Sequence, residues 1–135
     1  MYKKILAGLC GAIALNILHE TIRKNFDNVP HINEVGEEAL IKMTDGTAVE
    51  IKGEKTLYAA TLVGDIVSNG LYYATTATSH NITSGLLAGA GAIALPKQMG
   101  LNDAPVAETY KKKAMTVGYY LFGAFVTKFI YNKIK

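Results

Sequence analysis

Residues 57–79 read LYAATLVGDIVSNGLYYATTATS, an apolar stretch that is long enough to cross a bilayer as a helix and contains one carboxylate, Asp65, near its middle. A charged side chain at the centre of a membrane costs about 2.5–3.5 kcal/mol on insertion scales, so intramembrane acids usually face other helices and serve a function. Asp65 is therefore the first candidate for a functional residue in this chain.

Polar side chains recur along this stretch at spacings of three and four residues, which places them on one face of a helix. The opposite face is apolar. Because a surface that contacts lipid gains nothing from polar groups, we expect the polar face to point toward the protein interior. This face consists of Tyr58, Thr61, Asp65, Ser68 or Asn69, Tyr72 and Thr76.

Charge is distributed unevenly along the chain. Residues 24–55 contain seven acids and four lysines, so this segment has a net charge of −3 within a chain of 135 residues and net charge +3. The basic residues elsewhere mostly flank apolar segments. Charge at the segment ends and in one loop is typical of a small multi-pass membrane protein.

The apolar segments predict an all-α fold, an integral membrane four-helix bundle that forms a single domain over residues 1–135. We expect spans at about 3–24, 56–78, 81–96 and 113–132, a polar loop at 25–55, and both termini on one side of the bacterial inner membrane. We expect the first segment to be a retained helix, since no small-x-small cleavage site of a signal peptide follows it. A water-soluble helical protein is the alternative, because the first and third apolar runs are short.

The polar loop contains a segment, residues 33–52, with two possible structures. Asn33 can cap a short amphipathic helix that Gly46 would end, and we favour this helix. The alternative is a hairpin about Asp45-Gly46, with alternating apolar residues as its buried face. The helix would place Val35, Ala39, Leu40 and Met43 on one face, whereas the hairpin would align Ile41, Met43, Val49 and Ile51.

The later helices have recognisable ends and packing signals. The short connection 79–81 predicts that the second and third spans are antiparallel neighbours. Gly85-x-x-x-Gly89 and Ala88-x-x-x-Ala92 favour close helix packing, within one chain in preference to a dimer. We expect Pro96 to end the third helix, and the last helix can extend unbroken from Ala104 to Lys133.

A polar group of residues predicts an internal site. If the first two spans are antiparallel, Asp65 lies within a turn of Asn16 and about two turns from His19. Such a group can bind a cation, relay a proton or hold a polar headgroup; alternatively, Asp65 only locks the helices together. The candidate ligand-binding residues are Asp65, Asn69, Tyr72, Asn16, Thr61, His19 and Glu20.

The sequence His19-Glu20-x-x-Arg23 resembles the start of a zinc-protease helix. Arg23 replaces the second histidine, so the metalloprotease motif fails. A metal site formed with Asp65 and His80 is disfavoured, because His80 is expected on the opposite side of the membrane. We therefore predict no metal ligands and no catalytic residues, and expect Glu20 to pair with Arg23 or Lys24 and His19 to lie at the interface.

The favoured function is binding or conduction of a proton, a cation or a small polar or lipidic ligand at Asp65 and Asn69. One alternative is an accessory or scaffold protein that assembles through its glycine-rich helices as a homo- or hetero-oligomer. Another is a membrane-embedded enzyme that acts on lipid with His19 and Glu20. The residues indicate no particular cofactor.

Two further features bear on partners. Lys111, Lys112 and Lys113 can contact anionic lipid headgroups, although a solvated anchor explains them equally well. Nucleic-acid binding is not expected, since no recognition motif or basic surface with interleaved aromatic residues is present. Six tyrosines are expected partly in interfacial belts, although one of them, Tyr72, also belongs to the polar face of residues 57–79. They are Tyr58, Tyr72, Tyr73, Tyr119, Tyr120 and Tyr131.

Overall fold

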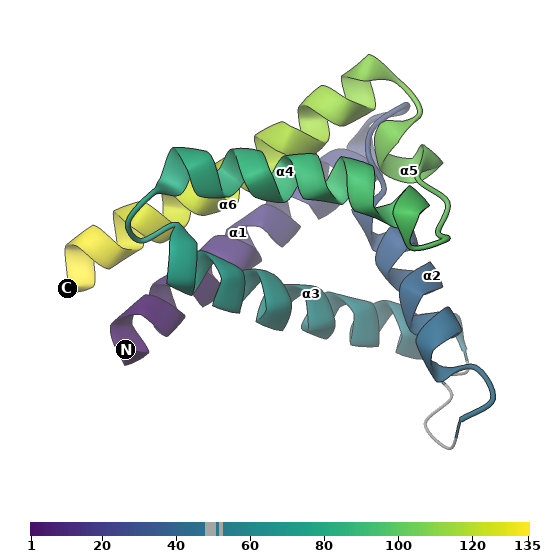
Figure 1. Ribbon diagram of the computed structural model, residues 1–135, viewed down its shortest axis with the longest axis horizontal. Helices are drawn as coiled ribbons and strands as arrows, with labels where there is room; N and C mark the ends of the chain where they lie inside the picture. The colour runs from purple at the N-terminus through teal and green to yellow at the C-terminus, as the bar shows by residue number, and fades with distance from the viewer. Residues whose placement is uncertain (48–50, 52) are drawn as a thin grey trace.

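The computed structural model describes residues 1–47, 51 and 53–135, and the regular structure in these ranges is entirely helical, as the sequence predicted. Figure 1 shows the arrangement of the helices. They are α1 (Tyr2–Asn25), α2 (Ile32–Thr44), α3 (Glu54–Thr76), α4 (Asn81–Gln98), α5 (Ala104–Ala107) and α6 (Tyr110–Ile134).

Glycines set how closely the long helices approach one another. α1 packs against both α3 and α6, and α6 also packs against α4. A Cβ atom at Gly8 of α1 would lie only 2.2 Å from the carbonyl oxygen of Gly70 in α3. A Cβ atom at Gly85 or Gly89 of α4 would lie 2.7 Å from a Cα atom of α6, so the predicted small-residue packing within one chain is confirmed.

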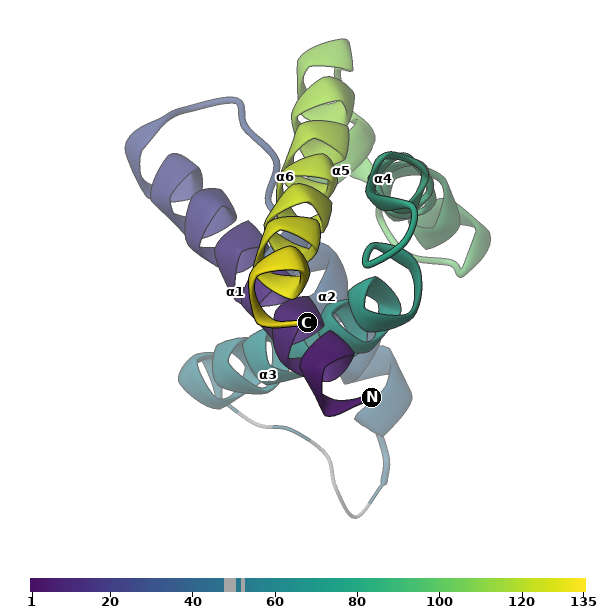
Figure 2. The same cartoon turned by 90° about the vertical axis from the view of Figure 1, so that its left-hand side faces the viewer.

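The long helices α3 and α4 are antiparallel but diverge, contrary to the expectation that they pack as neighbours (Figures 1 and 2). Two hydrogen bonds join them near their connecting turn: Tyr72 Oη donates to the Ser84 carbonyl oxygen at 2.6 Å, and the Thr76 and Ser84 hydroxyls are 2.7 Å apart. Beyond the turn α3 packs on α1 while α4 packs on α6, because their glycines face these different partners. The divergence leaves space for a cavity.

Two predicted helix ends are wrong. α4 continues through Pro96 to Gln98 and ends where Gly100 adopts a φ of 78°, with the Leu101 N–H bonded to the Pro96 carbonyl. The helix predicted from Ala104 to Lys133 is broken, because the Thr109 backbone is extended and its side chain accepts a hydrogen bond from the Lys112 N–H, starting α6 anew.

The favoured helix in the polar loop is confirmed over the described part of that segment. α2 begins at Ile32, without a side-chain cap from Asn33, and Gly46 follows its end with a φ of 73°. Ile41 and Met43 are helical, which rules out their place in the alternative hairpin. Val49 lies outside the described residues. The predicted apolar face is only partly covered, since Met43 is 74% exposed.

α2 is attached to the ends of other helices. It packs against α3 and α5. Its Glu38 carboxylate accepts a hydrogen bond from the Asn102 N–H at 3.2 Å, and the His31 N–H donates to the Pro105 carbonyl oxygen at 2.9 Å. These contacts hold α2 across the space between α3 and α5.

Small side chains and hydroxyl groups make up much of the interior, and many large apolar side chains lie on the outside. Buried residues include glycines, alanines, threonines and three tyrosines. The exposed large apolar residues of α3, α4 and α6 are Val63, Val67, Leu71, Ile82, Leu86, Leu87, Leu95, Phe122, Phe125 and Phe129. These helices thus expose many large apolar side chains, while a buried core that includes Leu15, Val29, Tyr73 and Val106 is also present.

Within the described part of the chain, α1 alone is both long and apolar enough to cross a membrane by those two criteria. A buried core helix or a signal sequence has the same properties, so one such helix is weak support for membrane insertion. The predicted four spans and multi-pass location are therefore not established by length and composition.

Gly8 provides a test of the α1–α3 contact. We expect Gly8→Ala to reduce the free energy of unfolding by about 1–3 kcal/mol, because its Cβ would clash with backbone atoms of α3. Only a movement of one of the two helices can relieve this clash. The matched control is Gly118→Ala in α6, where no atom lies within 4 Å and alanine should stabilise the helix by about 0.5–1 kcal/mol. Unfolding in mixed detergent micelles, followed by circular dichroism, measures both; equal effects would contradict the packing described.

Candidate functional site

Two cavities meet at Asp65 of α3. The smaller has a volume of about 10 Å³, roughly that needed for one water molecule, and the larger about 540 Å³. Ile32, Asp65, Asn69 and Tyr120 line both. Asp65 therefore lies where a small polar cavity adjoins a large one.

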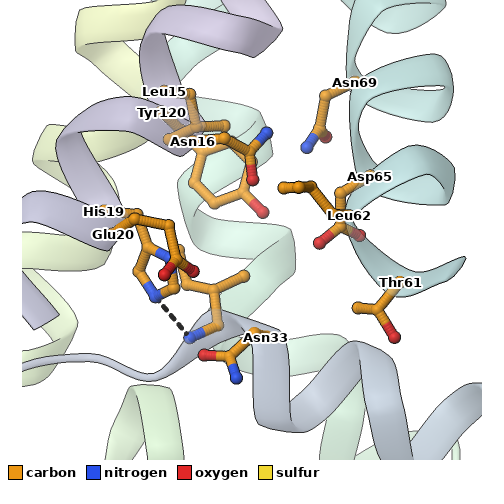
Figure 3. Close-up of a pocket in the computed structure, with 11 residues that line it drawn as sticks. Leu15, Asn16, His19, Glu20, Asn33, Thr61, Leu62, Asp65, Asn69 and Tyr120 are labelled. Atoms are coloured by element: carbon orange, nitrogen blue, oxygen red, sulfur yellow. Dashed lines mark hydrogen bonds and ion pairs between the residues drawn. The ribbon is translucent and has the colours of Figure 1, made fainter. Parts of the chain in front are cut away.

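The smaller cavity lies between α1, α2, α3 and α6 (Figure 3). Asp65 and Asn69 point from α3 toward Asn16 and Tyr120 (Figure 3). The sequence prediction that Asp65 and Asn16 lie close together is confirmed, because α1 and α3 pack antiparallel. The remaining lining residues are Leu15, His19, Glu20, Ile32, Asn33, Thr61 and Leu62.

The larger cavity occupies the space where α3 and α4 diverge. Its α3 wall is polar and its α4 wall is almost entirely apolar. Tyr72, a predicted site residue, lines this cavity and not the smaller one. The α3 wall consists of Asp65, Ser68, Asn69 and Tyr72; the α4 wall consists of Leu87, Ala88, Gly91, Ala92, Leu95 and Pro96; and the other lining residues are Ile32, Val35, Gly36, Ala39, Met99, Leu101, Val106 and Tyr120.

Asp65 is half-buried and lacks a partner in the part of the chain that the structure describes. None of these residues forms a hydrogen bond or ion pair with its carboxylate. No lysine or arginine of the described ranges lines either cavity. Gly36 of α2 passes close by, since a Cβ there would lie 3.6 Å from one Asp65 oxygen. The carboxylate is thus available to a ligand in either cavity.

Three hydroxyl donors near Asp65, those of Thr61, Ser68 and Tyr72, are already used, whereas Tyr120 lines both cavities beside Asp65 without an acceptor for its hydroxyl among the described residues. Thr61 donates to the Leu57 carbonyl oxygen at 2.8 Å, and Ser68 donates to that of Gly64 at 2.7 Å. The Tyr72 hydroxyl is occupied by Ser84 of α4. The oxygen atoms of these three hydroxyl groups can therefore accept hydrogen bonds from a ligand, but their hydrogen atoms are already engaged.

Amide oxygens add further acceptors. Asn16 Nδ2 donates to the Ala12 carbonyl oxygen at 2.8 Å, which leaves its Oδ1 atom for the cavity. Asn33 Oδ1 is buried without a hydrogen-bond partner among the described residues. Buried acceptors without donors are unfavourable, so this arrangement suits a molecule that donates hydrogen bonds.

His19 is buried, contrary to its predicted interfacial position. It is only 3% exposed, and its Nε2 atom accepts a hydrogen bond from the Ile32 N–H at 3.0 Å (Figure 3). Its ring also meets the Tyr119 ring edge-on, with centroids 5.9 Å apart. Because the chain after α1 turns back over this helix, His19 joins α1 to the start of α2 and is not free to bind a metal through Nε2.

Glu20 forms the ion pair that the sequence predicted. Its carboxylate lies 2.5 Å from the Arg23 guanidinium. The described residues contain no group of three or more His, Cys, Asp or Glu side chains placed to hold a metal ion, and His80 is exposed at the α3–α4 turn. Thus His19 and Glu20 line the smaller cavity mainly as structural residues.

Three tyrosines expected in interfacial belts are buried. Tyr73 donates through its hydroxyl to the Tyr120 carbonyl oxygen at 2.7 Å, and Tyr119 packs beside His19. Tyr120 lines both cavities beside Asn69 and was not predicted as a site residue. A signal was present: Thr116, Tyr120, Ala124 and Thr127 recur at helical spacing, the same kind of stripe that identified Asp65.

The role of His19 can be tested by removing its acceptor. We expect His19→Ala to destabilise the fold by about 1–3 kcal/mol, because the Ile32 N–H would lose its partner. Amide hydrogen exchange should accelerate at Ile32 more than in the middle of α6. His80→Ala is the control, since His80 is exposed; unchanged exchange at Ile32 in His19→Ala would show that this hydrogen bond does not hold α2.

Comparison of the chain with family models, with curated proteins and with solved structures found no match. Asp65, Asn69, Asn16 and Tyr120 are assigned to a candidate site by their geometry. This site can accept hydrogen bonds from a bound molecule, and the Asp65 carboxylate can pair with one positively charged group.

Proposed function

We propose that this chain is an integral membrane protein with an internal binding site for a small ligand, centred on Asp65 and Asn69. The observation that carries the proposal is the position of Asp65 at the junction of two cavities, without a cationic partner among the described residues. A carboxylate that only locked two helices together would be bonded to the neighbouring helix. Asp65 instead faces space large enough for a ligand.

The many exposed large apolar side chains support a membrane location. Lipid covers leucine and phenylalanine at no cost, whereas close packing of helices in lipid relies on small residues and buried hydrogen bonds. Gly8, Gly70, Gly85 and Gly89 lie at the helix contacts, and the exposed face of α6 presents phenylalanines. We propose that α1, α3, α4 and α6 all span the bilayer, with their polar groups turned inward.

Lys111 and Lys113 are exposed at the start of α6, where we propose that they contact anionic headgroups. Lys112 instead pairs with Glu108 at 3.0 Å. Of the other functions, assembly through glycine-rich helices is less favoured because these glycines already pack within the chain. An enzyme using His19 and Glu20 is less favoured because both side chains have structural partners.

A cavity-filling variant tests the binding site. The probe is dodecanol with a photoactivatable diazirine in its chain, added to the purified protein in lipid nanodiscs. We expect saturable labelling of peptides from α3 and α4, and loss of saturation in Gly91→Phe, because Gly91 lines the cavity and a Cβ there meets only Leu95, at 3.5 Å.

Ala90→Phe is the matched control, since Ala90 is the exposed neighbour of Gly91 on α4 and does not line the cavity. It should label like the original chain. Unsaturable labelling of the original chain, or equal labelling of the two variants, would show that the cavity takes no ligand of this kind. Release of the protein from membranes by alkaline carbonate would separately disprove the membrane location.

A further inference from the structure

We infer that the ligand is a cationic amphiphile: a single-chain amine whose ammonium group binds at Asp65 and whose hydrocarbon chain lies between α3 and α4. This inference rests on the proposed function and names the chemical class that the site accepts. It follows from the polar groups at the cavity junction, from the separation of polar and apolar walls, and from the exposed rim of the larger cavity.

The polar groups select the head of the ligand. Asp65 supplies a carboxylate without a partner among the described residues. In the adjoining smaller cavity, Asn33 Oδ1 is a buried acceptor without a hydrogen-bond partner there, and the Nδ2 donor of Asn16 is already bonded to Ala12. An ammonium group has donors and no acceptor, so it complements such a set. A carboxylate or phosphate head would instead lie beside Asp65 with no lysine or arginine in the cavity lining to compensate for the repulsion.

The cavity shape selects the tail. The larger cavity has a volume of about 540 Å³, within the range of about 300–1,000 Å³ that small-molecule sites occupy. Its polar residues lie on α3, while α4 contributes leucine, alanine and glycine. A bare cation would leave the apolar wall without a function, and an entirely apolar molecule would leave Asp65 unpartnered. An amphiphile uses both walls.

The rim of the cavity gives the ligand a route from the bilayer. Leu87 and Met99 line the cavity and are each 64% exposed, and Leu95 is 55% exposed. The cavity therefore opens on the apolar surface of α4. At one end α2 crosses the gap, held by the bond between Glu38 and the Asn102 N–H. A ligand that enters sideways past α4 can keep its hydrocarbon chain against the apolar side chains of α4 while its head group reaches α3.

Three photoactivatable probes with the same dodecyl chain test the head group: the amine, the alcohol and the carboxylic acid. In lipid nanodiscs we expect the amine to label the α3 and α4 peptides at the lowest concentration and the acid at the highest. Asp65→Asn should weaken saturable amine labelling about 10- to 100-fold, because a charge-assisted hydrogen bond is lost. Its effect on the alcohol should stay below about threefold.

Thr75→Ala is the matched control for a hydroxyl residue of α3, since this exposed side chain bonds to its own helix and lines neither cavity; it should leave the preference for the amine unchanged. If Asp65→Asn weakens the amine and the alcohol equally, or if the acid binds as well as the amine, the ligand class is wrong although the site stands. If none of the probes labels the cavity saturably, the binding site itself is disproved.

Discussion

Tyr73→Ala is expected to reduce the free energy of unfolding by about 3–5 kcal/mol, the loss typical of a buried aromatic side chain. Tyr73 is completely buried, and its ring fills the space above Gly123 of α6, where an added Cβ would lie 2.6 Å from the Tyr73 hydroxyl oxygen. Truncation would leave a void where α1, α3 and α6 meet. Thermal or detergent-induced unfolding followed by circular dichroism measures the change.

Tyr73→Phe separates packing from hydrogen bonding. It keeps the ring and removes only the bond to the Tyr120 carbonyl oxygen, which still accepts the N–H of its own helix, so we expect a loss of about 0.5–1.5 kcal/mol, the net value of one hydrogen bond. Tyr110→Ala is the control for truncation of a tyrosine, because Tyr110 is 89% exposed. Equal stability of Tyr73→Ala and Tyr110→Ala would contradict a packing role for Tyr73.

The sequence predicted the helices and part of the site because both follow from local spacing. Residues three and four apart share a helical face, which placed Thr61, Asp65 and Asn69 together. The rise per residue then placed Asn16 opposite Asp65 once α1 and α3 were taken as antiparallel. These inferences need only one helix or one pair of helices.

The divergence of α3 and α4 could not be predicted in the same way. A short turn fixes only the adjoining ends of two helices, and the contacts beyond it depend on which face carries the small residues. Gly70 faces α1, whereas Gly85 and Gly89 face α6. The larger cavity exists because α3 packs on α1 and α4 packs on α6, so no single segment of sequence predicts it.

Tyr120 and His19 show the limits of residue type as a guide. Tyrosine suits both a membrane interface and a buried hydrogen bond, and only the neighbouring helices decide between them. The buried position of His19 depends on the path of residues 26–31, which returns the Ile32 N–H to the imidazole. Neither α1 nor α2 alone contains that information.

Val67→Lys provides the strongest test of the membrane location. Val67 lies at the middle of the span predicted for α3, is half exposed, and does not line either cavity. A lysine at the centre of a lipid-facing helix costs about 2.5–3.5 kcal/mol, which shifts the insertion equilibrium of α3 on the order of 100-fold. A glycosylation acceptor placed in the α3–α4 turn of the 135-residue chain reports that insertion.

Met43→Lys on α2 is the control, because this exposed side chain lies in the polar loop, outside the proposed spans. It should leave insertion of α3 unchanged. If the protein were instead water-soluble, a lysine at Val67 would carry no insertion cost. A lysine at either exposed apolar position would then improve solubility without destabilising the helix. A soluble, folded Val67→Lys variant would therefore assign the exposed valines, leucines and phenylalanines to contacts with another protein, and the ligand at Asp65 would then enter from water.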